Sequence, residues 1–135
     1  MAFDLDHLPE NLSAALASPL YAALTTLRPD GAPHVVCVCM MYEEAERLAR
    51  VIARRGAVKL ANLKADPRAT LYMADGEGRW ASFEGRGRVF ENRERVAEAV
   101  RRHRDRYNKN TSVSPDFVAI EIQVERIIGE WWASG

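Results

Sequence analysis

A hairpin signature near the start of the chain is the sequence feature that most constrains its fold. Two apolar runs, Leu20–Arg28 and Pro33–Met41, are joined by the segment Pro29-Asp30-Gly31. Proline fixes φ at the first position of a tight turn, and glycine supplies the positive φ that such a turn needs. The second run is almost continuously apolar, which predicts a strand covered on both faces. We therefore expect the sheet to begin with an antiparallel pair of strands.

Strand patterns recur along the rest of the chain, with short breaks between them. Trp80–Phe90 alternates in the strand period, and its interior Gly85 and Gly87 predict a bulge or a close approach to the backbone. Phe117–Ile127 also alternates, which predicts a half-buried strand that the tail Ile128–Gly135 continues. The other expected elements are strands over Arg47–Arg54 and Ala69–Ala74, and helices over Pro9–Ala17, Ala57–Asp66 and Asn92–Asn108.

These elements together predict the architecture. Short strands separated by turns favour an antiparallel sheet over βαβ units, and closing such a sheet removes its exposed edges. We predict a mainly β (α+β) fold, a six-stranded antiparallel barrel with flanking helices, as a single domain over residues 1–135. Trp131 and Trp132 cannot both face inward. One is expected to pack on the barrel, and the other to be an interface anchor or a cofactor lid.

Composition and charge exclude several classes of function. Lys+Arg and Asp+Glu both number 19, and Arg93–Arg106 is interpreted as a solvated helix face, so no nucleic-acid partner is expected. No apolar run approaches the ~18 residues of a membrane span. Met1–Glu10 lacks the apolar core of a signal peptide. We therefore expect no membrane partner and a cytoplasmic location. Cys37 and Cys39 are interpreted as reduced core thiols rather than a redox pair or metal ligands.

Familiar catalytic signatures are absent from the sequence. It contains no phosphate-binding loop and no His-Glu-x-x-His motif. The three histidines, His7, His34 and His103, fall in different elements. We therefore assign no catalytic residue and no metal ligand, which disfavours acyl transfer and metal-dependent hydrolysis. A redox enzyme built on a bound cofactor needs few catalytic side chains, although a pure ligand-binding protein would present the same pattern.

Three blocks of the sequence resemble one known family. They are Leu24–Val36, Lys59–Arg68 and Gly78–Val89, in the order and with the spacing of the pyridoxamine 5'-phosphate oxidase-like split-barrel superfamily. The entry Gly78-Arg79-Trp80 and the ending Ile122–Gly129 are most similar to its flavin/deazaflavin oxidoreductase B branch, which includes coenzyme F420-dependent biliverdin reductases. The resemblance implies a split barrel of the FMN-binding type, working as a homodimer with the cofactor in a groove between subunits.

The resemblance also implies a set of cofactor-binding residues. Lys59 would contact the cofactor phosphate, and Trp80 would approach from the partner subunit. The end of the third strand would hold the phosphate and the ribityl chain, and the second strand would line the ring. The residues concerned are Ile52, Ala53, Arg54 and Arg55 in the third strand and Pro33, His34, Val35 and Val36 in the second. From spacing alone, a solvated basic turn is the favoured interpretation of the lysine and the arginines, and a structural role is favoured for His34.

One departure from the family pattern bears on the choice of cofactor. The run Ala53-Arg54-Arg55 stands where family members usually carry Ser or Thr. Arginine binds phosphate and carboxylate bidentately, and coenzyme F420 carries a phosphate and a polyglutamate tail, whereas FMN carries only the phosphate. Our leading hypothesis is an F420-dependent oxidoreductase that transfers a hydride to a conjugated small-molecule substrate. The alternatives are an FMN-binding oxidoreductase of the same superfamily and a non-enzymatic flavin- or tetrapyrrole-binding protein.

Overall fold

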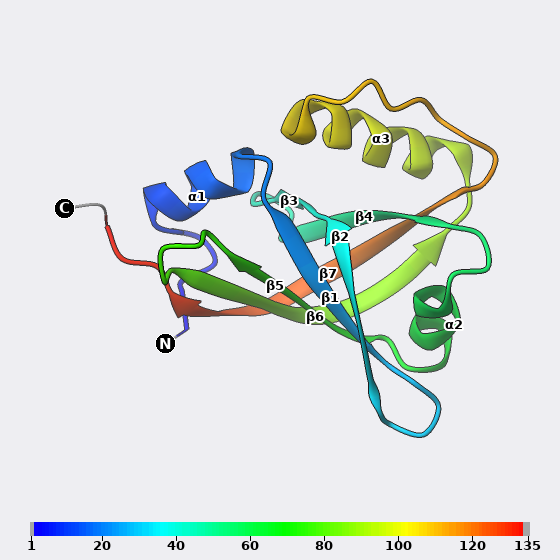
Figure 1. Cartoon of the computed structure of the whole chain (residues 1–135), viewed down its shortest axis with the longest axis horizontal. Helices are drawn as coiled ribbons and strands as arrows, with labels where there is room; N and C mark the ends of the chain where they lie inside the picture. The colour runs from blue at the N-terminus through cyan, green and yellow to red at the C-terminus, as the bar shows by residue number, and fades with distance from the viewer. Residues whose placement is uncertain (1, 134–135) are drawn as a thin grey trace.

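The computed structural model describes residues 2–133, which form one antiparallel sheet and three helices (Figure 1). In chain order the elements are α1 Glu10–Ala17, β1 Tyr21–Leu27, β2 Pro33–Cys39, β3 Met41–Glu43, β4 Leu48–Arg54, α2 Val58–Ala65, β5 Arg68–Ala74, β6 Trp80–Phe90, α3 Arg93–Tyr107 and β7 Phe117–Glu130. The strand order in the sheet is β2-β1-β5-β6-β7-β4-β3. The predicted mainly β fold is confirmed. No helix in this part of the chain is long and apolar enough to cross a membrane.

The two edge strands of the sheet, β2 and β3, are neighbours in the chain. Only Met40 separates them, although they lie at opposite ends of the strand order. β2 pairs with β1 along its whole length, and β3 then pairs with β4. One run of chain therefore joins both edges and curls the sheet into a split barrel. The predicted single strand Pro33–Met41 is divided at Met40, which gives seven strands instead of six.

The break at Met40 is held by the last turn of α3. The Tyr107 hydroxyl accepts a hydrogen bond from the Met40 amide at 3.0 Å and donates one to the Leu20 carbonyl at 2.7 Å. The buried Arg106 guanidinium donates to three backbone carbonyls, among them those of Met40 and Ser18. These bonds satisfy backbone groups that the ladder cannot pair where the strand changes partner. The interpretation of the α3 arginines as solvated is therefore wrong for Arg106.

The main core lies inside the curled sheet, where Phe83 and Ile120 are fully buried. A second cluster forms where α3 packs on β3, β4 and β7, and it includes Val100 and Ala119. Because α3 covers this region, Ala119 and Glu121 are buried although they lie on the face of β7 away from the main core. The first half of β7 is thus covered on both faces, which corrects the expectation of a half-buried strand.

Both interior glycines of β6 have a structural reason. The register between β6 and β7 shifts between Glu84 and Gly85, and a Cβ on Gly85 would overlap the Gln123 backbone. A Cβ on Gly87 would lie 2.9 Å from Leu63 Cδ2 in α2. The predicted bulge and the predicted close approach are both confirmed. Gly87 in particular lets α2 pack tightly against β6.

The outer face of β2, β1 and β5 is apolar and uncovered. Val35, Tyr21 and Tyr72 are 59%, 52% and 45% exposed, and Cys37 is exposed beside them. The strand register places all four side chains on the same face. The expectation that the strand Pro33–Met41 is covered on both faces is wrong for the single chain, and so is the assignment of Cys37 to the core.

The two tryptophans after β7 differ as expected. Trp131 is buried in the main core, whereas Trp132 is 50% exposed. The prediction that only one of these rings packs on the barrel is confirmed.

Candidate functional site

The candidate anion site lies where β4 ends and α2 begins. β4 ends at Arg54, Gly56 takes a φ of 80°, and α2 starts at Val58. The N-cap residue Ala57 makes no side-chain hydrogen bond to the helix, so amides of the first turn keep unsatisfied donors. These amides and the helix dipole favour an anion at this end of α2.

Lys59, in the first turn of α2, is a half-buried cation without a partner. Within residues 2–133, no hydrogen bond or ion pair reaches its ammonium group. Burial lowers the pKa of Lys59, because removing water disfavours the charged form. An anion bound at the start of α2 would pair with the ammonium and would stabilise its charged form.

The two adjacent arginines are held differently. Arg55 is engaged within the chain: its Nε donates to the Pro115 carbonyl at 2.8 Å, and its Nη1 pairs with Glu91. Arg54 is exposed, and its guanidinium lies 5.5 Å from the centre of the Phe117 ring without meeting a carboxylate of the described chain. Of the two, Arg54 is therefore the one whose donors are available to a ligand.

The side chains of Ile52 and Ala53 point into packed protein. Ala53 is buried in the main core, and Ile52 packs against the cluster under α3. Contact between these two residues and a ligand would therefore run through their backbone.

The β2 segment over residues 33–36 divides between two faces. Thr26 lies opposite His34, which puts His34 and Val36 on the inner face and leaves Pro33 and Val35 on the outer face. In a single chain, these four side chains do not line one surface. The His34 Nδ1 atom is buried on the inner face and has no hydrogen-bond partner among the described residues.

Trp80 lies away from the anion site within one chain. Trp80 pairs with Glu130 and Arg54 pairs with Phe117, which are the two ends of the 14-residue strand β7. On the uncovered outer face, Trp80 stacks on Tyr72 with ring centroids 5.9 Å apart. Within one chain the lysine and the arginines lie in adjacent segments, the first turn of α2 and the end of β4, whereas Trp80 lies at the other end of β7.

Two pockets flank the ion pair between Arg55 and Glu91. One, of about 250 Å³, lies between the start of α2 and β6 and reaches Lys64. The other, of about 300 Å³, lies beside Arg93 and the loop over residues 113–115. These pockets thus add two basic residues near Arg55, Lys64 in the last turn of α2 and Arg93 at the start of α3.

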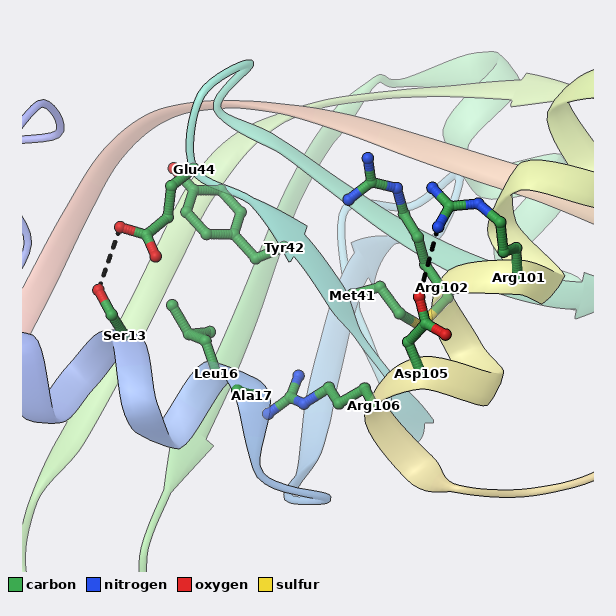
Figure 2. Close-up of a pocket in the computed structure, with 10 residues that line it drawn as sticks. All are labelled: Ser13, Leu16, Ala17, Met41, Tyr42, Glu44, Arg101, Arg102, Asp105 and Arg106. Carbon is green, nitrogen blue, oxygen red and sulfur yellow. Dashed lines mark hydrogen bonds and ion pairs between the residues drawn. The ribbon is translucent and has the colours of Figure 1, made fainter.

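A further pocket, of about 280 Å³, lies between α1, β3 and α3 and contains none of the expected site residues (Figure 2). Arg101 pairs with Glu98 and with Asp105, the second contact being visible in Figure 2. Arg102 pairs with Glu98 and Glu43. Because both arginines already pair with carboxylates, this pocket is less favourable for binding an anion than the start of α2 is.

The sequence alone did not identify the buried polar pair Asn62 and Thr26. Asn62 Nδ2 donates to Thr26 Oγ1 at 3.1 Å, and the two residues are 3% and 1% exposed. A signal for this contact was present, because Thr26 follows Ala22 and Leu24 in the buried phase of β1. A polar side chain at a buried strand position needs a hydrogen-bond partner, and α2 supplies it.

The sequence of this chain matches a known protein family and is similar to a known protein. Residues 8–130 match the family model described as pyridoxamine 5'-phosphate oxidase. The F420H(2)-dependent biliverdin reductase of Mycobacterium tuberculosis (strain CDC 1551 / Oshkosh) is 38% identical over 122 residues, which cover 90% of this chain and 88% of that protein.

Solved structures share the fold at lower identity. An F420 reductase superposes with a TM-score of 0.74 at 23% identity, over 90% of this chain and 98% of its own. A conserved hypothetical protein from Mycobacterium tuberculosis superposes with a TM-score of 0.78 at 21% identity, over 96% of this chain and 89% of its own. The structural matches support the split barrel, and the family model and the biliverdin reductase cover most of the sequence. This chain therefore belongs to the pyridoxamine 5'-phosphate oxidase family.

Proposed function

We propose that this protein is an F420-dependent oxidoreductase that transfers a hydride to a conjugated organic substrate. The observation that carries the proposal is the half-buried, unpartnered Lys59 at the uncapped start of α2, close in sequence to the unpaired Arg54. The 38% identical relative is named for its use of F420H(2), which supports a deazaflavin over FMN.

The residues around the start of α2 fit the anionic part of F420. The phosphate would meet the Lys59 ammonium and the first-turn amides of α2. Arg54 would bind the phosphate or a carboxylate of the polyglutamate tail, and Lys64 and Arg93 extend the basic surface for that tail. FMN has no tail to use these cations. When bound, the reduced cofactor supplies the hydride, and the chain holds and orients it.

We further propose that the protein works as a homodimer through the outer face of β2, β1 and β5. Val35, Tyr21 and Tyr72 expose large apolar side chains on that one face, and monomeric proteins rarely leave such a patch open. A second copy on this face would also carry its own Trp80 into the interface, because Trp80 stacks on Tyr72. The cytoplasmic location expected from the sequence stays a prediction.

Oxidation of reduced F420 tests the function. The purified protein is mixed anaerobically with F420H2 and a bilin or quinone acceptor, and the oxidised deazaflavin is followed by its absorbance. The proposal predicts oxidation that requires both protein and acceptor. At subsaturating cofactor, Lys59→Ala should slow it, and Lys59→Arg, which keeps the charge, should slow it less.

The other outcomes of this assay separate the alternatives. Turnover with reduced FMN and none with F420H2 would replace the proposal by the FMN-dependent oxidoreductase. Binding of F420 without turnover on any acceptor would favour the non-enzymatic binding protein.

A further inference from the structure

We infer that Asn62 and Thr26 form a positioning pair that sets where Lys59 sits relative to the ring-lining strand β2. This inference rests on the proposed function, because it assigns the pair a role in holding the phosphate-bearing cofactor. Neither residue belongs to the set that the family resemblance implies, and neither is placed in contact with the cofactor.

The attachment of α2 to the barrel depends on its packing against two strands. α2 has only eight residues and no side-chain cap, and a helix this short depends on tertiary contacts. It packs against β6 and β1. The contact with β6 is apolar, between Leu63 and the bare backbone at Gly87. The contact with β1 includes the buried hydrogen bond from Asn62 to Thr26. Apolar packing is non-directional, so this hydrogen bond is a directional contact that constrains how the helix is rotated on the sheet.

This hydrogen bond joins α2 to the strand that pairs with β2. Lys59 and Asn62 are three residues apart in α2 and therefore lie on neighbouring positions of one helix face. On the other side of the bond, Thr26 lies directly opposite His34 in the β1–β2 pair. The bond thus connects the helix face that presents the Lys59 ammonium to the β2 segment that the family resemblance assigns to the cofactor ring.

The hydrogen bond between Asn62 and Thr26 lies in a buried environment. Asn62 and Thr26 are almost fully buried, so water does not compete for the bond and its geometry is maintained. The neighbouring His34 Nδ1 is also buried and has no partner among residues 2–133. A cofactor with its phosphate on Lys59 and its ring along β2 would span this stretch. The pair therefore determines the distance between the two ends of the site.

The experiment compares two ligands that differ only at the anionic end. Fluorescence titrations measure the dissociation constants of F420 and of the deazariboflavin that has the same ring and ribityl chain as F420 but lacks its phosphate and tail, for the wild type and for Thr26→Val. Valine matches threonine in shape and removes the hydroxyl. We expect the F420 constant to rise roughly 3- to 10-fold, as for loss of one neutral hydrogen bond, and the deazariboflavin constant to stay the same. Thr26→Ser, which keeps the hydroxyl, should restore F420 binding.

A second background separates positioning from general destabilisation. In Lys59→Ala the ammonium is gone and only the first-turn amides of α2 still depend on the position of the helix, so adding Thr26→Val should weaken F420 binding less than it does in the wild type. Because Thr26→Val leaves the Asn62 amide without its partner, the double variant Asn62→Leu/Thr26→Val removes both polar groups and is expected to keep the fold. It should show the same selective loss of F420 binding.

Two results would overturn the inference. One is an equal weakening of F420 and deazariboflavin by Thr26→Val. The other is a loss that adds fully to that of Lys59→Ala, which would make the pair merely structural. A wild-type protein that fails to bind F420 is a different result, because it removes the proposed function itself and the inference with it.

Discussion

Arg54 and Arg55 are adjacent in the sequence, yet only Arg54 has hydrogen-bond donors available. We predict that Arg54→Ala weakens F420 binding about 10-fold or more, since a hydrogen bond to a charged group contributes roughly 1.5–3 kcal/mol. Arg55→Ala should weaken it less, because its guanidinium is held by Glu91 and the Pro115 carbonyl. Parallel fluorescence titrations of the two variants measure the difference. A greater loss with Arg55→Ala would show that the ion pair with Glu91 opens to receive the ligand.

Gly85 gives a prediction about stability at a single residue. A Cβ at this position would overlap the Gln123 backbone, which cannot move without breaking the β6–β7 pairing. We predict that Gly85→Ala lowers the free energy of unfolding by about 3 kcal/mol or more, at the upper end of overpacking costs. Gly76→Ala is the control. Gly76 has a φ of 83° but open space around it, so its loss should be about 1–2 kcal/mol. Urea denaturation of both variants measures this, and equal losses would mean that the bulge relaxes around a methyl group.

At the residue scale, the sequence predicts features that depend on neighbouring residues, but not contacts between residues that are far apart in the chain. Gly85 and Gly87 were found because they interrupt an alternating strand. The burial of Arg106 was missed, because its carbonyl partners lie in the turn after α1 and at Met40, far along the chain. The difference between the two site arginines depends likewise on Glu91, whose approach no local pattern encodes.

At the scale of single elements, α3 carries an ion-pair network whose effect depends on pH. The hydrogen bond from Arg101, with a second from Arg102, lowers the pKa of Glu98 from 4.5 to about 2. Because this pKa is lower in the folded state, the ionised Glu98 stabilises the fold fully above pH 4.5. That contribution is lost as the pH falls towards about 2.

The corresponding prediction compares the wild type with Glu98→Gln. The variant should melt at a lower temperature than the wild type at neutral pH, by a modest amount because the pairs are partly exposed. The difference should shrink as the pH falls and vanish near pH 2. Thermal melts followed by circular dichroism across this range test it. A constant difference at every pH would contradict the assigned role of the Glu98 charge.

Most helices and strands could be predicted because their ends are marked by residues next to them in the sequence. Pro29-Asp30-Gly31 marks the first turn, and Gly56 ends β4 before α2. The division of the second strand at Met40 could not be predicted, because the bonds that hold it come from Tyr107 in α3. The candidate anion site at Lys59 and its neighbours was implied by the family resemblance, and it stays a prediction. The Asn62–Thr26 contact that attaches α2 becomes visible only in the folded chain.

At the scale of the whole molecule, the sequence pattern of β2 predicts more burial than a single chain provides. Its near-continuous apolar pattern predicted cover on both faces, but one face is open in the monomer, with Val35 59% exposed. A hydrophobic pattern records burial in the assembled protein, and the homodimer proposed above would supply the missing cover.

The exposed outer face of β2, β1 and β5 gives a prediction about the oligomeric state. We predict that Val35→Asp yields a monomer, because a charge buried within an apolar interface is desolvated without a partner. Val113→Asp is the control, since Val113 is 41% exposed but lies in the loop before β7, away from that face. Analytical ultracentrifugation at micromolar concentration should show a dimer for the wild type and for the control. A monomeric wild type, or a dimer that survives Val35→Asp, would place the interface elsewhere or remove it.

The most direct test of the central claim is a fluorescence titration of the purified protein with F420 and, in parallel, with FMN. We predict that F420 binds more tightly than FMN. Lys59→Ala should weaken F420 binding about 10-fold or more, whereas Lys59→Arg should retain most of it. Tighter binding of FMN, or F420 binding that is unchanged in Lys59→Ala, would contradict a deazaflavin site at the start of α2.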